Sequence, residues 1–206
     1  MERNETVYDK SYQYYLEQIA EISFGDIADN LGVKIEGSEL KIPFFQNEYA
    51  VSINGMTDPA GKKPAYDIIV ILSKYILLCP DAPPKGHDWV SFKDFKDSGP
   101  LISFFANNVE HNISDYFSGK SADLKKAGTA LGGYSPTLEV NYDVAYQFDA
   151  LPMMPIMILF NDADEEFSAT CSILYQSRAE KFLDAECLAM VGSQLYFHLK
   201  NRFAGQ

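Results

Sequence analysis

The sequence predicts an α+β fold in a single domain, with an antiparallel-rich mixed sheet and about five helices packed on it. Two groups of short segments with alternating apolar residues, at 33–53 and 144–175, read as strands separated by turns. Helical periodicity fills the stretches before, between and after these groups. The 206 residues are 47% hydrophobic and 22% charged, which is typical of a globular protein large enough to bury a self-sustaining core.

The first part of the chain predicts a helix followed by a strand meander. Apolar residues recur at steps of four and three along one helical face, at Tyr8, Tyr12, Tyr15, Ile19 and Ile22. A short helical turn at 26–31 ends at Gly32, which suits a helix C-cap. Three strands are then expected at 33–36, 40–45 and 49–53. The Pro- and Gly-containing loop at 56–64 is the best position for a weak subdivision of the domain.

The other helices are expected at 67–79, 102–116, 121–131 and 184–199. The helix at 67–79 is apolar around its circumference, so we expect it to be buried. Ser121 and Asp184 have side chains suited to N-capping the helices that they start. A short extended segment, 89–92, carries the single tryptophan, Trp89.

The stretch from 143 to 175 is the predicted centre of the fold. Its first strand alternates over 144–149, and Pro152 and Pro155 then predict a stiff crossing or an edge segment. The continuous apolar run 156–160 is typical of a strand covered on both faces. An acidic turn follows, and 171–175 is expected to return as another strand.

Net charge and cysteine content limit the kinds of partner and the cellular compartment that the sequence favours. The formal net charge of −12, without a basic patch, disfavours nucleic acid. Three cysteines without a C-x-x-C motif disfavour a disulfide framework and favour the cytoplasm. The first ten residues lack the apolar region of a signal peptide. The longest apolar run, 68–78, is interrupted and too short to cross a membrane.

The acidic turn is the first candidate site. Four carboxylates fall within five positions and two more flank the preceding strand: Asp162, Asp164, Glu165 and Glu166, with Asp143 and Asp149. Together they could hold a hard cation such as Mg²⁺ or Ca²⁺, or share protons. The calcium-loop template fails, because Phe167 and Ile173 occupy the positions that need glycine and a bidentate acid. The alternative is a solvated turn with a carboxylate that caps backbone amides.

The remaining reactive residues give weaker signals. His87, next to Asp88 and Trp89 in a Gly/Pro loop, is a ligand-binding candidate together with that tryptophan, although an exposed loop histidine explains it as well. His111 and His198 are expected on solvated helix faces. Cys171 and Cys187 could be nucleophiles or soft-metal ligands, but free cysteines are commonly small buried side chains, and we expect that here. No metal-binding, serine-hydrolase or phosphate-loop motif is present, so no catalytic residue is assigned.

Several sequence features resemble one protein family. They are Asp143, Leu151-Pro152, Pro155, Asp164-Glu165-Glu166-Phe167, Leu174 and Phe182-Leu183, and less sharply Gly86, Trp89, Ser91-Phe92 and Leu131-Gly132-Gly133. On these residues the chain resembles the prokaryotic domain of unknown function 3786. The resemblance implies no established activity, an occurrence in anaerobes and, in some members, a preceding cysteine-rich iron–sulfur segment that this chain lacks. Gln176 and Asn161 depart from the family pattern, which puts a shared carboxylate constellation in doubt.

Two functional hypotheses follow. The first is a non-catalytic binding or accessory protein in anaerobic cofactor or metal metabolism, with a groove near the acidic turn and an unidentified small-molecule or protein partner. The second is a metal-assisted hydrolase or transferase with Asp162, Asp164 and Glu166 as ligands to the ion. The identity of any cofactor or metal is left open by the sequence.

Overall fold

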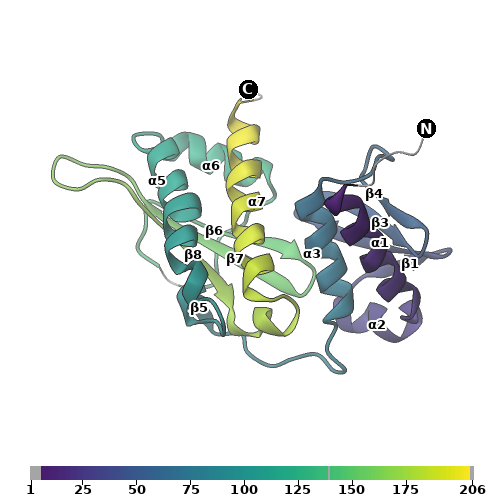
Figure 1. The fold of residues 1–206 in the computed structure, drawn as a ribbon. Coiled ribbons are helices and arrows are strands. Elements are labelled where there is room, and N and C mark those ends of the chain that lie inside the picture. Colours follow the sequence, from purple (N-terminus) through teal and green to yellow (C-terminus); the bar gives the residue numbers. More distant parts are fainter. Residues whose placement is uncertain (1–5, 139, 205–206) are drawn as a thin grey trace.

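The structure, a computed structural model, describes residues 6–138 and 140–204. Within these residues the fold is α+β, as predicted, with two four-stranded antiparallel sheets and helices packed against them (Figure 1). The helices are α1 (Val7–Ala20), α2 (Phe24–Leu31), α3 (Tyr66–Leu77), α4 (Ile102–Phe105), α5 (His111–Phe117), α6 (Ser121–Ala130) and α7 (Ala185–Ala204). The strands are β1 (Lys34–Glu36), β2 (Glu39–Phe44), β3 (Asn47–Ser52), β4 (Gly55–Thr57), β5 (Trp89–Ser91), β6 (Val144–Leu151), β7 (Met154–Asn161) and β8 (Thr170–Gln176).

The strands form two sheets where the sequence suggested one. The early meander has the order β1-β2-β3-β4, and the later strands have the order β5-β8-β7-β6. The sheets meet at the β2–β3 turn, where the amide of Phe45 donates to the carbonyl of Ala150 at 2.8 Å. Phe45 has a positive φ of 50°, which turns the chain back into β3. As a result β2 contacts β6 without joining its sheet.

β7 lies at the centre of the second sheet, between β6 and β8. Its residues from Met154 to Phe160 are all buried, which confirms the prediction of a strand covered on both faces. α3 is also largely buried, as its composition predicted. A continuous cluster of buried side chains includes residues from both sheets and from α3 and α7. The division of the chain into domains, including the weak subdivision at 56–64, stays a prediction.

Pro152 lies in the tight hairpin turn between β6 and β7, and Pro155 is the second residue of β7, opposite Asp149. Leu151 pairs with Met154, so Pro152 and Met153 form the turn. The amide of Met153 donates to the hydroxyl of Tyr75 on α3 at 3.2 Å, and that hydroxyl donates to the carbonyl of Leu31 at 2.7 Å. The stiff segment predicted from the sequence is therefore a turn fixed against a buried tyrosine.

The segment between β7 and β8 forms a long arm that extends away from the rest of the molecule (Figure 1). It leaves the sheet at Asn161 and returns at Thr170, which is paired with it. The acidic turn predicted from the sequence is the outer part of this arm.

The helix predicted at 102–116 contains a π-helical segment, Ala106–Glu110, which joins α4 to α5. The amide of His111 donates to the carbonyl of Ala106, five residues earlier. The buried Phe105, Val109, Ile113 and Phe117 follow one another at steps of four. Each step of four residues is longer than the 3.6 residues of one α-helical turn, and the difference adds up over three steps. The under-wound π segment offsets this difference and keeps all four side chains on the core face. Glu110 lies at the end of this segment.

α7 packs closely against this helix and against β8. Gly192 is buried, and a Cβ added there would lie 2.6 Å from the ring of Phe105 and 2.9 Å from the hydroxyl of Tyr175. That hydroxyl donates to the carbonyl of Leu188 at 2.8 Å. The close approach therefore fixes Phe105, which lines the cleft described below. Across residues 6–138 and 140–204, no helix has the length and apolar composition to span a membrane.

Gly192→Ala tests this contact. Alanine in a helix interior normally gains about 1 kcal/mol over glycine, but the new methyl group would overlap two buried aromatic side chains. We expect the free energy of unfolding in urea to fall by about 1–3 kcal/mol. Gly99→Ala is the control, because an added Cβ there meets nothing within 4 Å. Equal stability of the two variants would contradict the packing argument.

Candidate functional site

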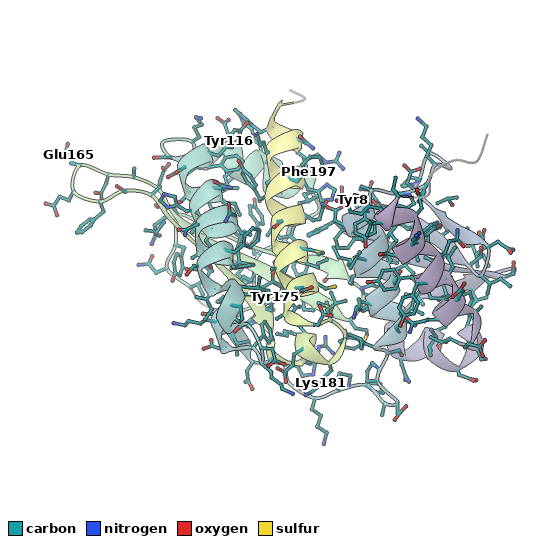
Figure 2. All side chains as sticks on the ribbon, in the orientation of Figure 1. Tyr8, Tyr116, Glu165, Tyr175, Lys181 and Phe197 are labelled. Atoms are coloured by element: carbon teal, nitrogen blue, oxygen red, sulfur yellow. The ribbon has the colours of Figure 1, made fainter. Side chains whose placement is uncertain are left out.

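The outer carboxylates of the arm shape a turn and face solvent. Asp164 Oδ1 accepts hydrogen bonds from the amides of Glu166 at 2.8 Å and Phe167 at 2.7 Å. These bonds lower the pKa of Asp164. Glu165 and Glu166 are exposed, and Glu165 lies at the tip of the arm, away from the body of the molecule (Figure 2).

Asp162, at the root of the arm, connects β7 to the start of α6. Its Oδ1 accepts from the amides of Gly119 at 2.6 Å and Ala163 at 2.9 Å, and its Oδ2 accepts from the amide of Ser121 at 3.0 Å. Partial burial raises the pKa of Asp162, but these backbone hydrogen bonds outweigh it and the net pKa is lowered. Ser121 was expected to cap α6 with its own side chain. That prediction is wrong, because Ser121 is the first helical residue and Asp162 is the acceptor for its amide.

Asp143 and Asp149 lie near opposite ends of β6, about 20 Å apart at the usual rise of a strand. Asp143 Oδ2 accepts from the amide of Asp162 at 2.8 Å. Asp149 Oδ1 accepts from the hydroxyl of Tyr134 at 2.9 Å. The structure therefore joins Asp143 to Asp162 and leaves Asp149 apart from the other candidate carboxylates. In the part of the chain that the structure describes, no three His, Cys, Asp or Glu side chains are grouped so that they could hold a metal ion.

The histidines are also dispersed. His87 is exposed in the loop before β5, and Trp89 is half-buried on β5 opposite Gln176. His111 is exposed on α5, as expected. His198 is half-buried against Phe45, at 5.1 Å between ring centroids, so the expectation of a solvated position for it is wrong. Burial lowers the pKa of His198, because the site disfavours the charged ring.

Cys171 and Cys187, near the predicted centre of the fold, are free thiols. Cys187 is buried, as expected, whereas Cys171 is half-buried on the outer part of β8. Burial raises the pKa of both thiols, which keeps them protonated and poorly nucleophilic.

A cleft of about 240 Å³ lies between β5, β8 and the helix that contains the π segment. Its lining residues are Ser91, Phe92, Lys93, Ile102, Phe105, Ala106, Glu110 and Ser172. The stacked rings of Phe92 and Phe105, with centroids 4.3 Å apart and planes 10° apart, form an apolar wall. Ser91, Lys93, Glu110 and Ser172 are the polar residues of the lining. A small apolar surface with a few polar groups is the usual character of a ligand site.

The cleft exists because β5 leaves β8 early. β5 pairs with β8 as far as Ser91 opposite Leu174. There the amide of Ser91 donates to Asp94 Oδ2 at 3.0 Å, and the chain turns into a short 3₁₀ helix, Phe92–Asp94. The next outward-facing amide of β8, that of Ile173, is left without a strand partner.

Glu110 occupies this position at the edge of β8. Its Oε1 accepts from the amide of Ile173 at 2.9 Å. Burial raises the pKa of Glu110, and the hydrogen bond from Ile173 and the charge of Lys93 only partly oppose this. A carboxylate with a raised pKa in a cleft is a mark of functional sites, and π segments inside helices are frequent at such sites.

Three other cavities adjoin one another around the start of α7, with volumes of about 320, 260 and 390 Å³. Three of the six charged side chains that line them are engaged within the protein. Asp184 accepts from the amide of Cys187 at 3.0 Å, as predicted for an N-cap, and pairs with Lys74 at 3.2 Å. Lys181 pairs with Glu180 at 3.0 Å. The Glu110 cleft is the better candidate, because it alone among the four combines a carboxylate of raised pKa with an adjoining π segment in the described residues.

The sequence analysis missed Glu110 although it identified the helix and the strand on either side of it. The steps of four between Phe105, Val109 and Ile113 were the available signal, because they indicate an under-wound helix with a polar residue beside its core face. Pairing with Ile173, 63 residues later, left no local trace in the sequence.

These features define an α+β protein with a small cleft of mixed polar and apolar lining at the edge of a sheet. Residues 23–197 match the model of a family described as a domain of unknown function (DUF3786). The chain belongs to this family, which confirms the resemblance seen in the sequence. Comparison with curated proteins and with solved structures gives no match.

Asp162→Ala tests the role of the inner carboxylate of the arm. Removal of three amide contacts should lower the free energy of unfolding by about 1–2 kcal/mol at neutral pH. In the wild type this stabilisation is present above the ordinary pKa of 3.8 and is lost as the pH falls through the lowered pKa. Urea unfolding measures both effects. Glu165→Ala is the control at the exposed tip, and a loss as large as that of Asp162→Ala would contradict the assignment.

Glu110→Gln tests the buried carboxylate. The native pKa lies above its ordinary value of 4.5, so the folded protein binds more protons than the unfolded chain in the interval between them. The free energy of unfolding of the wild type should therefore fall as the pH rises through that interval. Glutamine keeps an oxygen for the amide of Ile173 but carries no charge.

The stability of Glu110→Gln relative to the wild type should thus increase as the pH rises from the ordinary pKa of 4.5 through the raised pKa of Glu110, and then level off. Urea unfolding at a series of pH values measures this difference. Glu186→Gln makes the same chemical change at an exposed position on α7 and serves as the control. A stability difference for Glu110→Gln that is constant with pH would contradict the raised pKa.

Proposed function

We propose that this protein is a non-catalytic binding or accessory protein that holds a small ligand in the Glu110 cleft. The observation that carries the proposal is Glu110 itself. Its Oε1 is bound to the amide of Ile173, and Oε2 accepts no hydrogen bond from any described residue. A carboxylate oxygen at the wall of a cleft is an acceptor for a donor group on a ligand.

The polar groups of the cleft favour binding over catalysis. Nucleophilic catalysis by serine needs a base within hydrogen-bond reach of the hydroxyl. Ser91 and Ser172 line the cleft, but within the described ranges no hydrogen bond joins either hydroxyl to a histidine or carboxylate. These serines suit hydrogen bonding to a ligand. Glu110 suits recognition of a donor.

The second hypothesis, a metal-assisted hydrolase or transferase, has less support. Asp162 and Asp164 already use carboxylate oxygens to accept backbone hydrogen bonds, and Glu166 projects into solvent on the arm. A catalytic ion needs several ligands that converge on one point. The acidic side chains of the arm are better explained by turn formation and solvation.

The wider setting of the proposal rests on the sequence. A role in anaerobic cofactor or metal metabolism follows from the family resemblance alone. A cytoplasmic location is supported by three cysteines that remain thiols. The net charge of −12 supports a small molecule or a protein as partner in preference to nucleic acid. Asp143, Asp149, His87 and Trp89 stay secondary candidates for contacts to such a partner.

Native mass spectrometry of the purified protein tests the proposal. We expect a bound small molecule on the wild type and its loss from Glu110→Gln, because the amide group cannot pair with a cationic donor. Glu186→Gln should retain the molecule. An adduct-free wild type that binds no member of a metabolite library, or an adduct equally retained by Glu110→Gln, would contradict the proposal.

A further inference from the structure

The cleft contains two opposite charges that do not pair with each other. Lys93 and Glu110 both line it, yet no ion pair joins Lys93 to a carboxylate of the described residues. The charge of Lys93 does act on Glu110, since it opposes the rise in the pKa of that carboxyl. Lys93 is exposed and Glu110 is half-buried, so the cleft is lined by an ammonium and a carboxylate without an ion pair between them, and a ligand can lie between the two charges.

The size of the cleft limits what that could be. Sites for drug-sized ligands occupy roughly 300–1,000 Å³, and this cleft has about 240 Å³. Its apolar wall is one stacked pair, Phe92 and Phe105, with the side chain of Ile102 beside it. A single small metabolite with one short apolar group fits this volume and lining.

Resting on the proposed function, we propose that the cleft binds a small zwitterion of the α-amino-acid type, with its ammonium group at Glu110 and its carboxylate at Lys93. Ser91 and Ser172 then hydrogen-bond the polar groups, and the apolar side chain of the ligand lies against Phe92 and Phe105. Each ligand charge meets the opposite charge of the protein.

The two simpler ligand classes fit less well. A plain amine would pair with Glu110 and would leave the ammonium of Lys93 without a partner in the cleft. A plain carboxylic acid would satisfy Lys93 and would bring a second negative charge to a carboxylate that is already partly buried. A zwitterion avoids both shortcomings, because its ammonium lies at Glu110 and its carboxylate lies at Lys93.

The electrostatics of Glu110 give the proposal a second readout. An ammonium group next to this carboxylate lowers its pKa. Binding at a mildly acidic pH, where part of the free protein is protonated at Glu110, therefore releases protons to the buffer. Binding at a pH well above the raised pKa of Glu110 releases no protons from this carboxyl group.

The experiment is isothermal titration calorimetry of the full chain with a panel of the common L-amino acids. Each amino acid that binds is then compared with two analogues of the same side chain: the amine that lacks the carboxylate and the acid that lacks the amino group. We expect binding of at least one amino acid, and at least about tenfold weaker binding of both analogues. Titration in two buffers of different ionisation enthalpy measures the proton release.

The variants locate the site. Glu110→Gln and Lys93→Gln should each weaken binding of the amino acid at least about tenfold, and Lys93→Arg should restore most of it. Lys96→Gln and Glu186→Gln are matched controls at exposed positions outside the cleft and should leave the affinity within about twofold. Urea unfolding of each variant verifies that it is folded.

Three results would overturn the proposal. None of them decides the broader proposed function, which native mass spectrometry tests separately. No binding by any amino acid would remove the zwitterion, while native mass spectrometry still decides whether a ligand is carried. Equal affinity of the amine analogue, with dependence on Glu110 but not on Lys93, would establish an amine site instead. Binding that is unaffected by both cleft variants would place the amino acid elsewhere.

Discussion

The edge of β8 is the constraint on which the arrangement of the site depends. An amide that faces out of a partly covered sheet needs an acceptor, and β5 supplies one only as far as Ser91. Beyond that point Glu110 takes the place of the strand at the amide of Ile173. The carboxylate is held by the backbone on one oxygen and left available on the other. Sheet completion and the proposed ligand recognition therefore depend on the same side chain.

The position of Glu110 depends in turn on the packing of the helix that carries it. The π segment keeps Phe105 and Val109 on the core face and brings Glu110 to the strand edge. Gly192 lets α7 approach the ring of Phe105, so this ring stays stacked on Phe92. The cleft is consequently supported from behind by well-packed aromatic side chains, which favours a preformed site over one that must close around its ligand.

The carboxylates of this chain illustrate how environment separates residues of the same type. Asp162 and Asp164 accept several amide hydrogen bonds, which lowers their pKa and makes them part of the backbone framework. Glu110 has one such bond and a higher degree of burial, so its pKa rises. The density of acidic residues in the sequence therefore pointed to the arm, whereas the chemically distinctive carboxylate is a single glutamate in a helix.

The sequence by itself determined the α+β class, the meander, the buried β7 and α3, the Asp184 cap and the family, because apolar periodicity and capping residues act over a few neighbouring positions. Only the tertiary structure decided that the strands form two sheets. It also decided that Asp162 accepts from the amide of Ser121 at the start of α6 and that Glu110 accepts from the amide of Ile173. Each of these depends on pairing between residues about 40 or more positions apart. Local patterns leave such pairings open, since any suitably placed acceptor can satisfy a free amide, and the packing of the whole chain selects which one does.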